Sequence, residues 1–169
     1  MTRVYQRIDD PKIGDCFKCC VASILDLGYD DVPNLIEYED NWIEETQKFF
    51  RKYDYDYTGT ELYNPNLLFL ENPLNNVYKD VEIDERLTFK NMKISESING
   101  LFIAVVYSPK YTDPNQHPIS HLHCVLCDKD LNIVFDPQKN YETVINYPYS
   151  KLIGFNGIRS VDIIKKIDD

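Results

Sequence analysis

The chain has 169 residues, 43% of them hydrophobic and 27% charged, which is the composition of one globular domain rather than of a disordered or fibrous chain. Its 18 basic and 28 acidic side chains leave a net charge of −10, and such a surface disfavours nucleic acid and anionic membranes as partners. The longest apolar stretch, residues 100–107, is far shorter than the about 20 residues that cross a bilayer. No apolar run follows the first basic residue, as a secretory signal requires, so we expect a cytoplasmic protein without a membrane segment.

The first half of the chain is predicted to be helical. After an extended arm over residues 1–15, apolar side chains recur at helical spacing from Cys16 to Leu27. Asp15 precedes them as the N-cap residue, whose carboxylate is expected to accept a hydrogen bond from a free amide of the helix. Gly28 is expected to end the helix.

A turn at residues 30–33 leads to a second predicted helix, over residues 41–53. The apolar side of this helix is expected to consist of Trp42, Ile43, Thr46, Phe49 and Phe50. Residues 54–98 contain Asn-Pro breakers between short apolar pairs and acidic side chains, so we expect an irregular segment there.

The second half of the chain changes to β-structure. Four segments are strand candidates: 101–107, 122–127, 133–135 and 160–164. The second and third are joined by a turn at 128–132, which predicts an antiparallel hairpin. Helices followed by an antiparallel sheet predict an α+β fold, with residues 1–169 as a single domain.

The five cysteines, at positions 16, 19, 20, 124 and 127, are an odd number in a chain without an export signal, which argues against a disulfide framework. Their two Cys-x-x-Cys pairs leave open a zinc site with four thiolates, and the first pair, at a helix start, leaves open a redox motif. Two features disfavour these alternatives. Residues three apart on a strand point to opposite faces, and the first pair follows a polar turn instead of a buried strand. We expect no metal and no cofactor.

Cys16 is the candidate nucleophile, because a helix N-terminus lowers the pKa of a thiol. Its alternative role is that of a small buried hydrophobic residue, which fits Cys20 better. A general base must come from the three histidines, at positions 117, 121 and 123. On a strand His123 points to the face opposite Leu122 and Cys124, so it can face the helix tip while its neighbours fill the core.

Asp136 directly follows the strand predicted after His123. The hairpin would bring it beside His123, as the acceptor that orients an imidazole, whereas the alternative is an Asp-Pro turn without a chemical role. Acyl transfer also needs donors for the oxyanion. The backbone amide of Cys16 can supply one, and the side chain of Gln6 is the candidate for a second.

In this order the residues resemble the papain-like cysteine peptidases, and more closely a group of small papain-like proteins of bacteriophages and bacteria. The shared pieces are Gln6, Gly14-Asp15-Cys16-Phe17, Val21-Ala22-Ser23-Ile24-Leu25, Asp31-Val32-Pro33, Tyr107-Ser108-Pro109, His123-Cys124-Val125-Leu126 and Phe135-Asp136-Pro137. They cover residues 4–33 and 100–137. Two departures are Cys124, where a small Ala is usual, and a long connection from Pro109 to Ser120.

The resemblance implies a papain-like fold in which the helix that carries the cysteine packs on a C-terminal antiparallel sheet. It also implies that Cys16 is the nucleophile, His123 the base, Asp136 the orienting residue and Gln6 a part of the oxyanion hole.

The sequence thus predicts a thiol hydrolase that cleaves an amide, peptide or isopeptide bond through a Cys-His-Asp triad. A non-catalytic binding module, for example a phage counter-defence protein, and a transglutaminase-like acyltransferase are the alternatives. The expected partner is a protein or peptide substrate, or a small amide ligand, of basic or neutral charge. If the chain is phage-encoded, we expect it in the host cytoplasm. The sequence predicts no particular oligomeric state.

Overall fold

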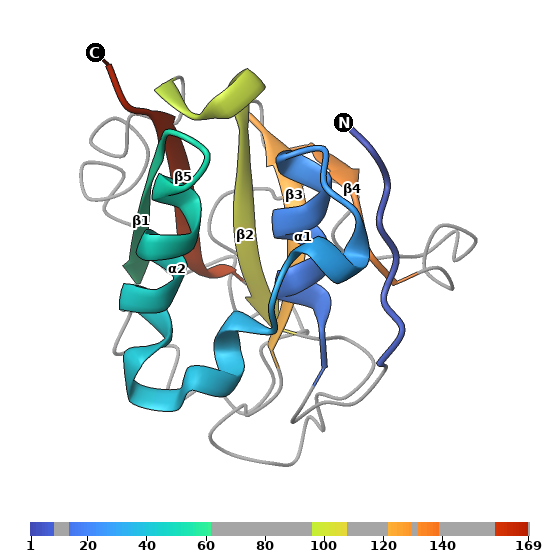
Figure 1. Cartoon of the computed structure of the whole chain (residues 1–169). Coiled ribbons are helices and arrows are strands. Elements are labelled where there is room, and N and C mark those ends of the chain that lie inside the picture. Colours follow the sequence, from blue (N-terminus) through green and yellow to red (C-terminus); the bar gives the residue numbers. More distant parts are fainter. Residues whose placement is uncertain (9–13, 62–95, 108–121, 130–131, 139–157, 169) are drawn as a thin grey trace.

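The structure, a computed structural model, describes residues 1–8, 14–61, 96–107, 122–129, 132–138 and 158–168. It is an α+β fold in which helices pack on a five-stranded antiparallel sheet (Figure 1). The helices are α1 (Cys16–Ile24) and α2 (Trp42–Arg51), and short 3-10 helices span Tyr29–Asp31, Leu35–Asn41 and Ile98–Gly100. The strands are β1 (Tyr55–Glu61), β2 (Leu101–Tyr107), β3 (Leu122–Asp128), β4 (Ile133–Phe135) and β5 (Ile158–Lys166). No helix among these residues is long and apolar enough to span a membrane.

The strand order in the sheet is β1-β5-β2-β3-β4, and all described pairings are antiparallel. The strands predicted in the second half of the chain are confirmed, as is the hairpin of β3 and β4. The last strand, β5, lies between β1 and β2 and pairs with both, which joins the two halves of the chain in one sheet (Figure 1).

Strand β1 falls in the segment that the sequence predicts to be irregular, so that expectation is wrong for residues 55–61. The strand is hard to recognise because it is an edge strand that contains a glycine and has polar residues at all its other positions except its two tyrosines. Only Tyr57 among its described side chains is fully buried, where it stacks on Phe50 of α2 at 5.5 Å between ring centroids. Residues 62–95, the rest of that segment, lie outside the described residues, as do His117 and His121.

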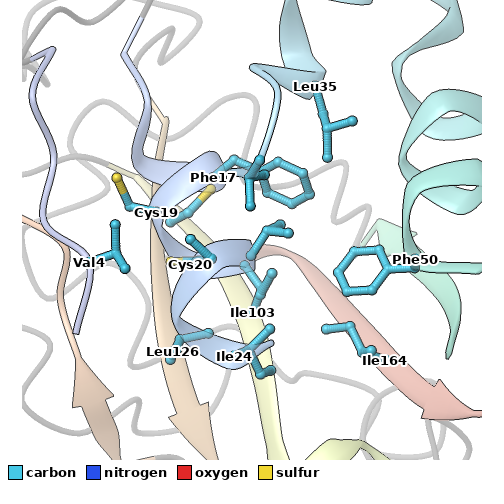
Figure 2. Close-up of a cluster of buried hydrophobic side chains, with 14 of the residues drawn as sticks. Val4, Phe17, Cys19, Cys20, Ile24, Leu35, Phe50, Ile103, Leu126 and Ile164 are labelled. Atoms are coloured by element: carbon cyan, nitrogen blue, oxygen red, sulfur yellow. The ribbon is translucent and has the colours of Figure 1, made fainter. Parts of the chain in front are cut away.

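The hydrophobic core lies between the two helices and one face of the sheet. Figure 2 shows side chains of α1 and α2 meeting those of three strands: Phe17, Ile24, Phe50, Ile103, Leu126 and Ile164. From Cys19 to Ile24 every side chain of α1 is buried, so the helix is enclosed on all sides and its tip is held in a fixed position on the sheet. The second helix is amphipathic, but Ile43, predicted on its apolar side, is 48% exposed.

Helix α1 is shorter than predicted and ends at Ile24, because Asp26 and not Gly28 supplies the left-handed residue that ends it. Asp26 has a φ of 56°, and the amide of Leu27 donates to the carbonyl of Ala22 at 2.9 Å. This is the pattern of a Schellman motif, which usually places glycine at the left-handed position. An aspartate there does not stand out in a sequence.

Candidate active site

The N-terminal tip of α1 meets strand β3 and the segment that follows β4. Cys16, the first residue of α1, is only partly buried and packs against the core beside Cys124. Its side chain makes hydrogen bonds with two residues of β3, His123 and Cys124. A sulfur and an imidazole from segments more than a hundred residues apart thus meet at one point.

His123 is also bonded to Asp136. Its Nε2 lies 2.8 Å from Oδ1 of Asp136, and both side chains are buried, with exposed fractions of 4% and 7%. The backbone amide of Gln138 donates to the same oxygen at 2.8 Å, which fixes the carboxylate. Because Nε2 is used by Asp136, the other ring nitrogen, Nδ1, is the one available to Cys16. The imidazole bridges a thiol and a carboxylate.

The β3–β4 hairpin creates this arrangement. Phe135 of β4 pairs with Leu126 of β3, so the chain that continues from β4 runs back beside the N-terminal half of β3. Asp136 is the first residue after β4 and therefore reaches His123, thirteen positions earlier in the sequence. The contact that the sequence predicts between these two residues is present.

The charges of the site favour a thiolate beside an imidazolium. A hydrogen bond from the Cys124 thiol lowers the pKa of Cys16 well below its usual value; burial opposes this, and the hydrogen bond and charge of His123 support it. For His123, burial acts to lower the pKa, but the hydrogen bonds with Asp136 and Cys16 outweigh burial and raise it to about 10. At neutral pH, Cys16 is then the deprotonated member of the pair and His123 the protonated one.

Asp15 does not cap α1 with its side chain, so that prediction is wrong. Its buried carboxylate instead accepts hydrogen bonds from the amides of Arg7 and Ile8, at 3.0 and 3.3 Å, and from the hydroxyl of Tyr29 at 2.6 Å. The N-terminal arm passes the tip of α1 at this point, and its amides take the carboxylate that the helix would otherwise use. Asp15, the residue before the nucleophile, therefore ties the arm to the tip of α1.

Gln6 lies on this arm and contacts the segment that follows Asp136. Its backbone amide donates to the carbonyl of Pro137 at 2.9 Å, directly after Asp136. Its side-chain Nε2 donates to the carbonyl of Ile8 at 3.3 Å, and its Oε1 is buried without a partner in the described part of the chain. Nε2 carries a second N–H, which is the donor that an oxyanion at Cys16 would use.

The remaining cysteines differ from Cys16 in their surroundings. Cys19, Cys20 and Cys127 are completely buried, and burial is the main cause that raises the pKa of each thiol. All five cysteines are free. Within the described ranges no three His, Cys, Asp or Glu side chains are grouped so that they could hold a metal ion. Cys124 was not assigned to the site from the sequence. A cysteine at this position, where a small Ala is usual, is a signal that could have indicated it.

Neither protein-family models, nor curated proteins, nor solved structures yield a match to this chain. The function is therefore inferred from the contacts among Cys16, His123 and Asp136 and from the resemblance of the surrounding sequence.

Proposed function

We propose that the protein is a papain-like thiol hydrolase that cleaves an amide, peptide or isopeptide bond. The observation that carries this proposal is the position of His123, which hydrogen-bonds Cys16 on one side and Asp136 on the other. A cysteine with only a packing role needs neither a hydrogen bond from a histidine nor a carboxylate that orients that histidine. A nucleophile, a base and a residue that orients the base are what acyl transfer requires.

In the proposed reaction the Cys16 sulfur attacks the carbonyl carbon of the substrate. The negative charge that develops on the carbonyl oxygen is stabilised by the backbone amide of Cys16, at the positive end of α1, and by the second N–H of the Gln6 side chain. His123 then donates its proton to the leaving amine, the C–N bond breaks, and a thioester with Cys16 forms. The neutral imidazole takes a proton from water, and the water oxygen attacks the thioester carbonyl. The C–S bond then breaks, the carboxylic acid leaves, and the Cys16 thiolate and the protonated His123 are restored.

The net charge of −10 favours a basic or neutral protein or peptide as the substrate. If an amine attacks the thioester in place of water, the same residues perform acyl transfer, and this is the alternative reaction. A papain-like scaffold that only binds a partner is the other alternative. The three possibilities differ in their products, so one series of experiments separates them.

The first experiment compares the thiols within one chain. At about pH 6, where ordinary thiols are protonated, we expect iodoacetamide to alkylate Cys16 more than about tenfold faster than the other four. Trypsin releases Cys16 as the only cysteine of the peptide 13–18, so its labelling is read by mass spectrometry. His123→Ala should slow the labelling of Cys16 and leave that of the others unchanged. Equal and slow labelling of all five thiols would contradict the proposal.

The second experiment tests turnover with peptide, isopeptide and glutamine-amide substrates, with Cys16→Ala as the control. Hydrolysis by the wild type alone supports the proposal. Incorporation of an added amine into the product would identify the acyltransferase. A chain whose reactive Cys16 turns over no substrate of any class would instead support the binding module.

A further inference from the structure

Cys124 contributes a second thiol at the tip of α1. Its S–H donates to the Cys16 sulfur, and this contact is the strongest influence on both thiols. Cys124 is 6% exposed and belongs to the core, whereas Cys16 is only partly buried. The site therefore holds two thiols in contact, and a hydrolase needs only that of Cys16.

We propose that Cys16 and Cys124 are the two halves of a reversible disulfide, which forms when a peroxide oxidises Cys16. The site would thus accept hydroperoxides as a second class of reactant. This inference rests on the reactive thiolate of the proposed function but not on hydrolysis, since no step of it involves an amide.

The chemistry takes two steps. The Cys16 thiolate attacks one oxygen of the peroxide, the O–O bond breaks, and Cys16 becomes a sulfenic acid while the second oxygen leaves as hydroxide or alkoxide and is protonated. The Cys124 sulfur then attacks the Cys16 sulfur, the S–S bond forms, and the S–O bond breaks. The thiol proton of Cys124 and the departing hydroxide leave as water. The two thiols lose two electrons, and the peroxide gains them.

Oxidation of Cys16 also prepares Cys124 for the second step. The largest cause that raises the pKa of Cys124 is its hydrogen bond to Cys16, and the negative charge of that thiolate adds to it. A sulfenic acid is neutral, so the charge disappears after the first step. Cys124 then ionises more readily, next to the sulfur that it must attack.

The other three cysteines are worse placed than Cys124. Cys19 and Cys20 are fully buried, and Cys16 influences the pKa of each only through its charge, without the hydrogen bond that it shares with Cys124. Cys127 is three residues from Cys124 on β3, so its side chain points to the opposite face of the sheet. A disulfide at Cys16 is therefore expected to select one partner.

The disulfide would switch the site off reversibly. It removes the nucleophile, and it also protects Cys16 from further oxidation to sulfinic acid, which thiols do not reverse. A reducing agent restores both thiols. A small apolar side chain would be enough for packing at position 124, so a role as the resolving cysteine would explain why a thiol is found there.

The experiment treats the full chain with hydrogen peroxide, blocks remaining thiols, and digests the protein with trypsin without reduction. Cys16 is in peptide 13–18, and Cys124 is in peptide 111–129, together with Cys127. Cys124→Ala and Cys127→Ala are thus matched variants of one peptide, and Cys124→Ser is a second variant should alanine disturb the core. Circular dichroism establishes that each variant is folded.

We expect the wild type and Cys127→Ala to yield a cross-link between the two peptides that dithiothreitol removes. We expect both Cys124 variants to lose this cross-link and to accumulate Cys16 that has gained two oxygen atoms. A cross-link that persists without Cys124, a cross-link of Cys16 to Cys19 or Cys20, or sulfinic acid at Cys16 in the wild type without a cross-link would overturn the inference. Because the readout is a mass, failure of the hydrolase proposal in the substrate screen leaves this result unaffected.

Discussion

His123 depends on the charge of Asp136 as well as on its position. Burial alone would make the imidazole neutral, and hydrogen bonds with Asp136 and Cys16 instead keep it protonated up to about pH 10. The carboxylate is fixed by the Gln138 amide and is not free to follow the imidazole. An amide at position 136 can accept the same hydrogen bond from Nε2 but carries no charge.

Asp136→Asn should therefore lower the pKa of His123 by about one unit or more, since an opposite charge in direct contact contributes that much. The ring protons of His123, assigned by their absence in His123→Gln, report this pKa in an NMR titration. Asp30→Asn removes an exposed carboxylate and should leave the titration unchanged. An unaltered pKa in Asp136→Asn would show that the hydrogen bond, and not the charge, holds the proton.

Residue types and spacing were enough to predict the contact between His123 and Asp136, because a hairpin places the residues at its open end side by side. The same reasoning could not predict the Cys124–Cys16 contact. Adjacent residues on a strand point to opposite faces, so only the exact position of the helix tip at the strand decides that both reach Cys16. For Gln6 the sequence indicated a neighbour of the site, but not that its Nε2 would turn to Ile8.

At the scale of elements, the N-terminal arm is held by the residue before the nucleophile. Asp15 is completely buried and accepts three hydrogen bonds, two from the arm and one from Tyr29. The arm has one further backbone bond near the site, from Gln6 to Pro137. A local rule predicted a helix cap for Asp15, and it failed because a segment outside the helix offered the carboxylate better-placed donors.

We expect Asp15→Ala to release the arm, because it leaves three donors without an acceptor, and to lower the free energy of unfolding by about 2 to 4 kcal/mol. Hydrogen exchange at the amides of Arg7 and Ile8 measures this directly: both should be protected in the wild type and exchange rapidly in the variant. Tyr29→Phe removes only the hydroxyl donor, so it should cost about 1 kcal/mol and keep the two amides protected. Equal exchange in both variants would mean that Asp15 does not hold the arm.

At the scale of the whole molecule, the sequence predicted an α+β fold with a C-terminal antiparallel sheet, and this is confirmed. Strongly apolar strands and a helix with regular apolar spacing carried that prediction. The sequence could not predict the place of β5 between β1 and β2, since pairing of segments about a hundred residues apart depends on the complete sheet. That placement has an electrostatic consequence, because β5 brings an aspartate into the interior.

Asp162 of β5 lies opposite Gly59 and Ile103, with an exposed fraction of 1%. Its Oδ2 has no partner among the described residues, and a Cβ on Gly59 would come within 3.1 Å of its Oδ1. Burial raises the pKa of this carboxyl group from the usual 3.8 to about 7, which the nearby Tyr57 hydroxyl only partly offsets. The fold thus buries an acid that is half ionised near neutral pH.

The acid makes the stability of the molecule depend on pH. Below the unfolded pKa, Asp162 is protonated in both states and adds no pH dependence to the free energy of unfolding. Between about pH 4 and pH 7 the folded state binds more protons than the unfolded chain, so the free energy of unfolding falls as the pH rises. The difference between 3.8 and about 7 corresponds to about 4 kcal/mol.

Asp162→Asn removes the titrating group and keeps the shape of the side chain. We expect the free energy of unfolding of the variant, relative to that of the wild type, to increase by about 4 kcal/mol from pH 4 to pH 8. Urea unfolding at each pH measures this difference. Asp56→Asn, an exposed carboxylate on neighbouring strand β1, should unfold in parallel with the wild type at every pH. If Asp162→Asn also runs parallel to the wild type, Asp162 reaches solvent when it ionises, and the interior between β1 and β2 is wetter than its packing implies.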